Sequence, residues 1–192
     1  MRTTPSVELA ATNNIVPISG SDWNDIIEIP GLRSHDRMIP WFNRVSGGYF
    51  RTLGTPLLAG RDFDQHDTVS SAEVALVNQE FSCKFLAGAN PVGRQIRLIV
   101  GPGDPEHLYQ ITGLVKNSKY QSLRVEFKPL VFVAESQSKE PTQRISVMVP
   151  SRAPVGALNA ALKQAAARAN PEMSIAFQVF QTQVRNRYCA TG

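Results

Sequence analysis

The sequence predicts an α+β fold with two lobes, in which both ends of the chain form a βαβ-type lobe and a strand-rich lobe is inserted between them. Three observations support this prediction. The chain has 192 residues, a length that suits either one compact domain or two small lobes. Its last part reads as strand, helix and strand, and its middle holds short alternating strands separated by Gly and Pro turns. We therefore expect residues 1–85 and 144–184 to form the first lobe, residues 86–143 the inserted lobe, and residues 185–192 a terminal tail.

The first stretch of the chain shows a weak internal repeat. Residues 3–10 carry a polar helix end, a Pro and an alternating strand, and residues 169–176 repeat these features at the same offsets. If the repeat is real, its first strand and helix lie before Met1. Trp23 and Trp41 flank a segment of mixed character. This segment predicts either a loop whose apolar side packs on the core or an exposed apolar surface that meets a partner.

A strand and a short helix come next. Residues 39–45 alternate as a strand does, and Gly47 and Gly48 then lead out of it. The aromatic residues Tyr49 and Phe50 follow, spaced as in a short amphipathic helix. This arrangement predicts a tight turn between strand and helix.

A second strand-helix pair begins at residue 73. Residues 73–77 predict a strand, and Asn78 is a typical cap for the helix after it. Phe81 and Phe85 lie one helical turn apart, and Gly88 marks the end of the helix.

Three strands make up the rest of the middle of the chain. Residues 94–100 and 108–115 alternate on either side of residues 101–105, whose Gly and Pro content predicts a hairpin loop. Residues 130–134 form a further short strand.

The final unit has the clearest pattern. Residues 144–149 alternate and end at a Pro, and apolar residues then recur at helical spacing over residues 154–169. Residues 173–179 alternate again. Two strands joined by a helix predict a βαβ unit with a right-handed crossover.

The only cluster of acids and histidine lies at residues 62–67. Its spacing partly imitates a calcium loop, but the sixth position, which needs a Gly, is Asp67. We interpret it as a solvated turn in which Asp64 or Asp67 caps a helix. The sequence holds no nucleophile elbow, phosphate loop or dinucleotide fingerprint. No catalytic, cofactor-binding or metal-binding residue is therefore expected.

The remaining chemically active side chains read as structural or solvated. The histidines, which are His35, His66 and His107, have polar neighbours in sequence and are interpreted as surface residues. We expect Cys83 to be a buried structural thiol on its helix. Cys189 lies near the end of the chain, and nothing in the sequence supports a disulfide between the two.

Charge and hydropathy exclude two function classes. The net charge is +4, and the basic residues are dispersed and form no stripe along which successive phosphates could bind. Nucleic-acid binding is therefore not expected. The sequence also has no run of about 20 apolar residues, the length that spans a bilayer, so no membrane-spanning helix is expected within it.

Residues 45–63, VSGGYFRTLGTPLLAGRDF, resemble the signature of the periplasmic core domain of MacB-like permeases, in the FtsX-like ABC transporter superfamily. Blocks similar to those of the same family follow in order at residues 74–94 and 111–133 and in the closing βαβ unit. The style of these blocks is closest to the duplicated permeases of Acidobacteria. The sequence departs from the family at Gly47, where Pro is usual, and at residues 178–184. The signature positions are Tyr49, Phe50, Gly54, Gly60, Asp62, Phe63, Asn78, Pro91 and Gly93.

The resemblance implies a periplasmic domain between two membrane helices of a permease, with a porter-like lobe formed by both ends of the chain. It implies that ATP is hydrolysed on a separate cytoplasmic domain or subunit. The expected partners are the membrane helices of the same permease, a periplasmic adaptor protein and a second copy in a homodimer. Gly54 and Gly60 would permit tight turns, and Tyr49 and Phe50 would pack. The alternatives are a free-standing periplasmic module that binds a ligand or peptide, and a hydrolase that uses residues 62–67.

Overall fold

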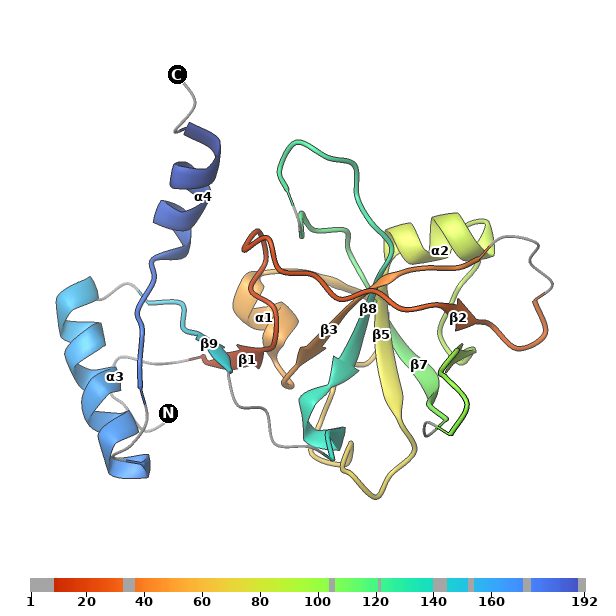
Figure 1. Cartoon of the computed structure of the whole chain (residues 1–192), viewed down its shortest axis with the longest axis horizontal. Helices are drawn as coiled ribbons and strands as arrows, with labels where there is room; N and C mark the ends of the chain where they lie inside the picture. The colour runs from red at the N-terminus through yellow and green to blue at the C-terminus, as the bar shows by residue number, and fades with distance from the viewer. Residues whose placement is uncertain are drawn as a thin grey trace. The chain divides into compact units, whose positions relative to one another are not determined.

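A mixed sheet of nine strands dominates the structure, a computed structural model, and few helices accompany it (Figure 1). This confirms the α+β class. The structure describes residues 9–32, 37–103, 106–120, 122–139, 145–151, 154–170 and 174–189.

The strands occupy most of the positions that the alternating patterns predict. They are β1 (Ala11–Asn13), β2 (Ile27–Glu28), β3 (Trp41–Val45), β4 (Leu57–Gly60), β5 (Val74–Asn78), β6 (Gln95–Leu98), β7 (Leu108–Val115), β8 (Leu130–Ala134) and β9 (Ser146–Met148). Their order in the sheet is β2-β6-β7-β5-β8-β3-β1-β9, and β4 pairs with β7 off this path. The helices are α1 (Tyr49–Leu53), α2 (Gln79–Leu86), α3 (Val155–Ala169) and α4 (Phe180–Cys189), and a 3-10 turn covers Glu135–Gln137.

The centre of the sheet is apolar on both faces. Every residue of β5 and of β8 is buried, and the two strands pair antiparallel with each other. On their outer sides, β5 pairs parallel with β7 and β8 pairs parallel with β3. Figure 1 shows β3, β8 and β5 side by side. Continuous apolar runs such as residues 130–134 are typical of strands covered on two faces.

A different helix covers each face of this centre. Phe81 of α2 belongs to one buried cluster with Val77 and Val131, whose side chains lie on the same face of the sheet. Phe132, the next residue of β8, points to the opposite face, where its ring contacts Phe50 of α1. The predicted short helices therefore cover the two faces of one sheet.

The predicted hairpin of residues 94–115 is confirmed, because β6 and β7 pair antiparallel. Residues 104–105 of its loop lie outside the described residues. The second half of β7 continues past β6 and pairs with β4, which places Gly60 opposite Gly113. The sequence gives no local sign of this pairing.

The chain divides into two compact units, of which one is residues 11–147 and the other is residues 1–10 with 148–192. This division differs from the expected inserted lobe at 86–143. Strand β5 from the expected first lobe lies between β7 and β8 from the expected inserted lobe, so one sheet holds all three. The boundary between the two units depends on pairing between strands that are far apart in sequence, which local sequence patterns do not predict.

The last predicted strand, at residues 173–179, is not found in the described residues 174–179. The helix predicted at residues 154–169 is confirmed as α3, but residues 174–179 form no strand, and α4 begins at Phe180. Alternation predicts a half-buried strand only where a neighbouring strand pairs with it. Ile175 and Val179 instead remain exposed. Within the described residues, no helix is long and apolar enough to cross a membrane.

Candidate functional site

The signature residues 45–63 form a compact strand, helix and edge strand within the larger unit. Helix α1 follows β3 directly, and the left-handed glycines Gly48 (φ 80°) and Gly54 (φ 67°) bound it. Glycine adopts this backbone without the clash that a Cβ atom causes. The short amphipathic helix and the turn before it are both confirmed.

Aromatic rings hold α1 on the sheet. Tyr49 and Phe50 are buried, and each ring contacts Phe132 of β8, with centroids 6.1 and 4.9 Å apart. The Tyr120 ring also packs edge-to-face on Phe132, with ring centroids 6.5 Å apart. The edge-to-face geometry of Phe50 on Phe132 is the favourable arrangement for such pairs.

The Tyr49 hydroxyl lies among buried amides. It bonds with the side chains of Asn13 and Asn43, and its burial raises the pKa of Tyr49 above its usual range. Asn43 in turn accepts from the backbone N–H of Ile15 at 3.0 Å and donates to its carbonyl at 2.9 Å. The neutral Tyr49 hydroxyl, through its hydrogen bonds to these amides, therefore holds α1 next to the segment after β1.

Asp62 connects the two ends of the signature. Its carboxylate accepts from the backbone N–H of Gly48 at 3.2 Å and from that of Phe63 at 2.8 Å. Its burial raises its pKa, and these two bonds oppose that rise. A Cβ atom on Gly47 would lie 2.8 Å from the Phe63 carbonyl oxygen, so the turn before α1 packs directly on residue 63.

The acid cluster at residues 62–67 forms a turn centred on an ion pair. Arg61 donates from both terminal nitrogens to the Asp67 carboxylate at 2.7 Å, and the Asp64 backbone N–H donates to the same carboxylate at 2.9 Å. The Arg61 guanidinium lowers the pKa of Asp67 below its usual value. Within the described ranges, no three His, Cys, Asp or Glu side chains are grouped so that they could hold a metal ion. The Asp67 carboxylate is engaged with Arg61 and is not aimed at solvent.

Asn78 joins three elements at the other end of β5. Its side-chain oxygen accepts from Phe81 N–H at 3.0 Å, which confirms the predicted cap, and from Leu130 N–H at 2.9 Å. Its amide donates to the Lys128 carbonyl at 2.8 Å. The start of α2 and the start of β8 are thus fixed by one buried side chain.

Pro91 and Gly93 shape the turn before β6. Arg94 N–H donates to the Pro91 carbonyl at 3.0 Å, and Gly93 has φ 89°, as the third residue of a type II turn requires. Gly93 N–H also donates to the Ile111 carbonyl of β7 at 2.8 Å. The nine signature residues therefore act in turns, caps and packing, and they do not converge on one point.

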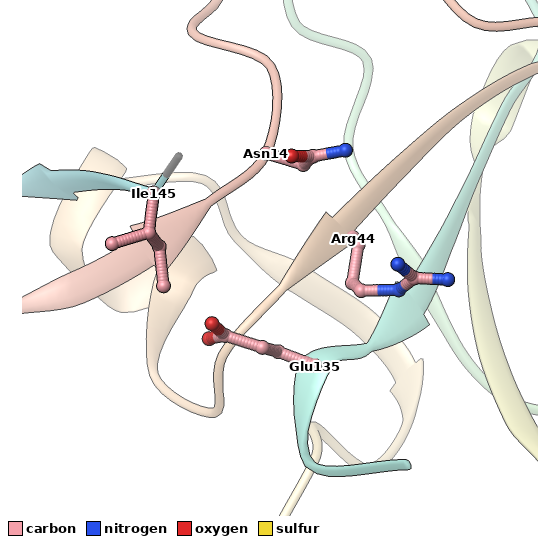
Figure 2. Close-up of a pocket in the computed structure, with 4 residues that line it drawn as sticks. All are labelled: Asn14, Arg44, Glu135 and Ile145. Atoms are coloured by element: carbon pink, nitrogen blue, oxygen red, sulfur yellow. The ribbon is translucent and has the colours of Figure 1, made fainter. Parts of the chain in front are cut away.

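A shallow hollow, open to solvent, lies between the end of β3 and the start of β9. Figure 2 shows its lining residues, which are Asn14, Arg44, Glu135 and Ile145. Glu135 accepts from the Thr12 hydroxyl, and the Arg44 guanidinium lies 5.8 Å from the Trp23 ring centroid. Its two charged groups therefore already have partners in the protein.

Two predictions about single side chains were wrong. Cys83, predicted to be buried, is exposed, because the buried face of α2 is formed by Phe81, Ser82 and Leu86. His107, interpreted as a surface residue, is half-buried, and its Nδ1 lies 2.9 and 3.0 Å from the two carboxylate oxygens of Glu73. The pair joins residues far apart in sequence, which spacing could not reveal.

The remaining predictions concern the other two histidines and the segment after Trp23. His66 is exposed, as predicted, and lies 3.0 Å from Asp64. His35 lies outside the described residues. Ile27 and Ile29 are 2% exposed, so the segment after Trp23 packs its apolar side on the core.

The loop between β7 and β8 is the feature that sequence reasoning missed. Leu123, Val125 and Phe127 are exposed there, and charged residues separate them. Their alternation with charged residues was the available signal.

Residues 3–165 match the profile of the family described as MacB-like periplasmic core domain. No curated protein matches the sequence. The fold is similar to the periplasmic region of MacB from Actinobacillus actinomycetemcomitans, with a TM-score of 0.66 at 13% identity, covering 100% of this chain and 80% of that chain.

A second solved structure agrees. The extracellular domain of the ABC-type transporter YknZ from Gram-positive bacteria has a TM-score of 0.57 at 14% identity, covering 88% of this chain and 78% of that chain. At these identities the likeness shows a shared fold.

Proposed function

Since the chain belongs to the family of MacB-like periplasmic core domains, we propose that it is the extracytoplasmic part of an ABC-type permease that transmits conformational change during export. The match over residues 3–165 is the observation that carries this proposal. The chemistry of ATP hydrolysis would take place on a separate cytoplasmic domain or subunit. The parent protein would be of the duplicated-permease type found in Acidobacteria.

The division into two units supports a mechanical role. The larger unit holds a sheet that is apolar on both faces, and such close-packed bodies transmit displacement without deforming. The smaller unit contains both ends of the chain, where flanking membrane helices would connect. We propose that this unit corresponds to the porter-like lobe, and that a periplasmic adaptor and a second copy of the domain are the partners. Family membership favours this function over a free-standing binding module.

Distance measurements in the full-length permease test the proposal. Spin labels would be placed at Lys84 on α2 and Lys163 on α3, both exposed, in a background where Cys83 and Cys189 are Ser. The permease, in lipid with its ATPase, would be measured by electron-spin resonance with and without a non-hydrolysable nucleotide. A domain that transmits the nucleotide state should show two different distance distributions.

A label pair within one unit is the control. Lys84 and Val69 both belong to residues 11–147 and should keep the same distance in both states. Identical distributions for the Lys84–Lys163 pair, with ATPase activity retained, would contradict a role in transmission.

A further inference from the structure

A segment at residues 116–129, between β7 and β8, presents apolar side chains at the surface of the larger unit. Leu123, Val125 and Phe127 are 42%, 40% and 39% exposed, and every residue from 123 to 128 is exposed. The described residues of this segment form no helix or strand, and segments of this length without secondary structure are usually either functional or disordered. None of the three belongs to the signature or to the buried core.

The segment is held in place from within. Lys119 Nζ donates to the Val125 carbonyl at 2.6 Å and lies 4.5 Å from the centroid of the Phe127 ring. Arg124 N–H donates to the Ser122 hydroxyl at 3.2 Å. A preformed surface of this kind loses little conformational entropy when a partner binds.

The base of the segment is anchored to two other parts of the unit. Glu80 N–H at the start of α2 donates to the Asn117 side chain at 2.8 Å. Ile18 N–H donates to the Tyr120 carbonyl at 2.6 Å. Movement of a bound partner would therefore be passed to the helix that covers one face of the sheet.

The segment also concentrates positive charge. It has four basic side chains, at Lys116, Lys119, Arg124 and Lys128, against the single acid Glu126. Basic residues elsewhere in the chain are dispersed. Charge of one sign around apolar side chains selects an oppositely charged partner and speeds its association.

We propose that residues 116–129 form a docking surface for a protein partner whose contact region is acidic and partly apolar. A second copy of this chain fits less well, because it carries the same net charge of +4. An anionic membrane fits less well too, because the apolar side chains are more than half covered and Glu126 lies among them. The inference goes beyond the proposed function and stands whether or not the parent exports a substrate.

Binding of a designed probe tests the inference on the full chain. The probe is a short synthetic peptide of Glu, Leu and Gly, and its counterpart has every Glu replaced by Lys. Nuclear magnetic resonance would map the amides that each peptide perturbs, and fluorescence anisotropy would give the affinity at low and high salt. We expect the acidic peptide to perturb residues 116–129 and to bind more weakly as salt rises. The basic peptide should not bind there.

Matched variants separate this surface from other exposed residues. Arg124→Glu and Val125→Ser should each weaken binding of the acidic peptide by roughly tenfold. Lys84→Glu and Val69→Ser alter an exposed charge and an exposed apolar side chain elsewhere and should leave it unchanged. Circular dichroism would verify that all four variants are folded.

Three outcomes would overturn the proposal. One is that the acidic peptide fails to bind or perturbs other residues, and another is that the control variants weaken its binding equally. The third is that Arg124→Glu and Val125→Ser instead abolish sedimentation with phosphatidylglycerol vesicles or abolish a dimer seen by light scattering. That result would assign the surface to a membrane or to a second copy.

Discussion

At the residue scale, the two signature glycines that were expected to permit tight turns have different tasks. Gly54 ends α1 with φ 67°, and a Cβ atom there would meet nothing within 4 Å. Gly60 has φ 76°, and a Cβ atom there would lie 2.0 Å from the Thr112 carbonyl oxygen. Gly54 therefore supplies a backbone conformation, whereas Gly60 also allows β4 to approach β7.

This difference predicts unequal costs for the same substitution. Gly60→Ala should lower the free energy of unfolding by about 3 kcal/mol or more, because the strands must separate. Gly54→Ala should cost only about 1 kcal/mol, the penalty of a left-handed non-glycine residue. Urea unfolding of both variants gives the comparison. Equal losses would show that β4 does not pack on β7 as described.

The ion pair of Arg61 with Asp67 predicts a pH-dependent contribution to stability. The pKa of Asp67 is lower in the folded protein than in the unfolded chain, so its contribution is present above the unfolded value of about 3.9 and is lost as pH falls through the folded value. Asp67→Asn should lower the free energy of unfolding by about 2 kcal/mol at pH 7, because the buried Asp67 side chain would lose its charged hydrogen bonds to Arg61.

Unfolding measured at several pH values checks the sign. The difference between the wild type and Asp67→Asn should shrink below about pH 4. Asp64→Asn is the control, since that side chain is 44% exposed and its replacement should change stability little. A difference that is constant with pH would rule out the ionised pair as its source.

At the element scale, the buried rings of Tyr49 and Phe50 hold α1 on the sheet, and Tyr49 also carries a buried hydroxyl. Tyr49→Ala should cost about 3 to 5 kcal/mol, because it removes a ring that packs on Phe50 and Phe132. Tyr49→Phe keeps the ring and loses only the bonds to the amides of Asn13 and Asn43, so about 1 kcal/mol is expected. Thermal unfolding of both variants tests this order. A phenylalanine variant as unstable as the alanine variant would show that the hydroxyl dominates.

Asn78 gives a second prediction at this scale. Asn78→Ala should cost about 2 to 3 kcal/mol, because it leaves the buried N–H groups of Phe81 and Leu130 without their acceptor. Asn78→Asp keeps an acceptor for both and loses the donor to Lys128, so its cost should be smaller. Hydrogen exchange of the first turn of α2, measured with urea unfolding, distinguishes the two variants. Unchanged exchange in the alanine variant would contradict the capping role.

Elements defined by local patterns were predictable, and pairings between distant segments were not. The strand at residues 130–134, the helix after Pro154 and the Asn78 cap each follow from residues next to one another in sequence. The pairing of β4 with β7 and the contact of His107 with Glu73 join residues far apart in sequence. Residues 174–179 show the opposite error, because alternation alone does not supply the neighbouring strand that a sheet requires.

The same distinction applies to the candidate site. The signature residues were recognisable as a group, and their packing role follows from their types. The docking segment was overlooked because its apolar side chains resemble core residues when read singly. Phe127 has charged neighbours in sequence whereas Phe132 lies in an apolar run, and the fold shows that Phe127 is exposed and Phe132 is buried.

At the scale of the whole molecule, the buried apolar side chains are distributed unequally between the two units. Of the buried hydrophobic residues in the described ranges, all but Leu162 and Ala166 belong to residues 11–147. That unit also contains the entire signature and the proposed docking surface at residues 116–129. Burial of apolar surface is the main favourable term in folding. The larger unit therefore has the apolar core that it needs to fold alone, whereas the described part of the smaller unit has only these two buried apolar side chains.

We predict that a fragment of residues 11–147 folds by itself. It should unfold cooperatively in urea and keep the near-ultraviolet dichroism of its packed aromatic rings. A peptide of residues 148–192 should be largely unstructured, since α3 has two buried side chains and isolated helices of about its length are marginal in water. The matched control is the full chain, whose aromatic dichroism the fragment should reproduce. Gradual unfolding of the fragment, or loss of that dichroism, would mean that the sheet needs residues outside 11–147 to form.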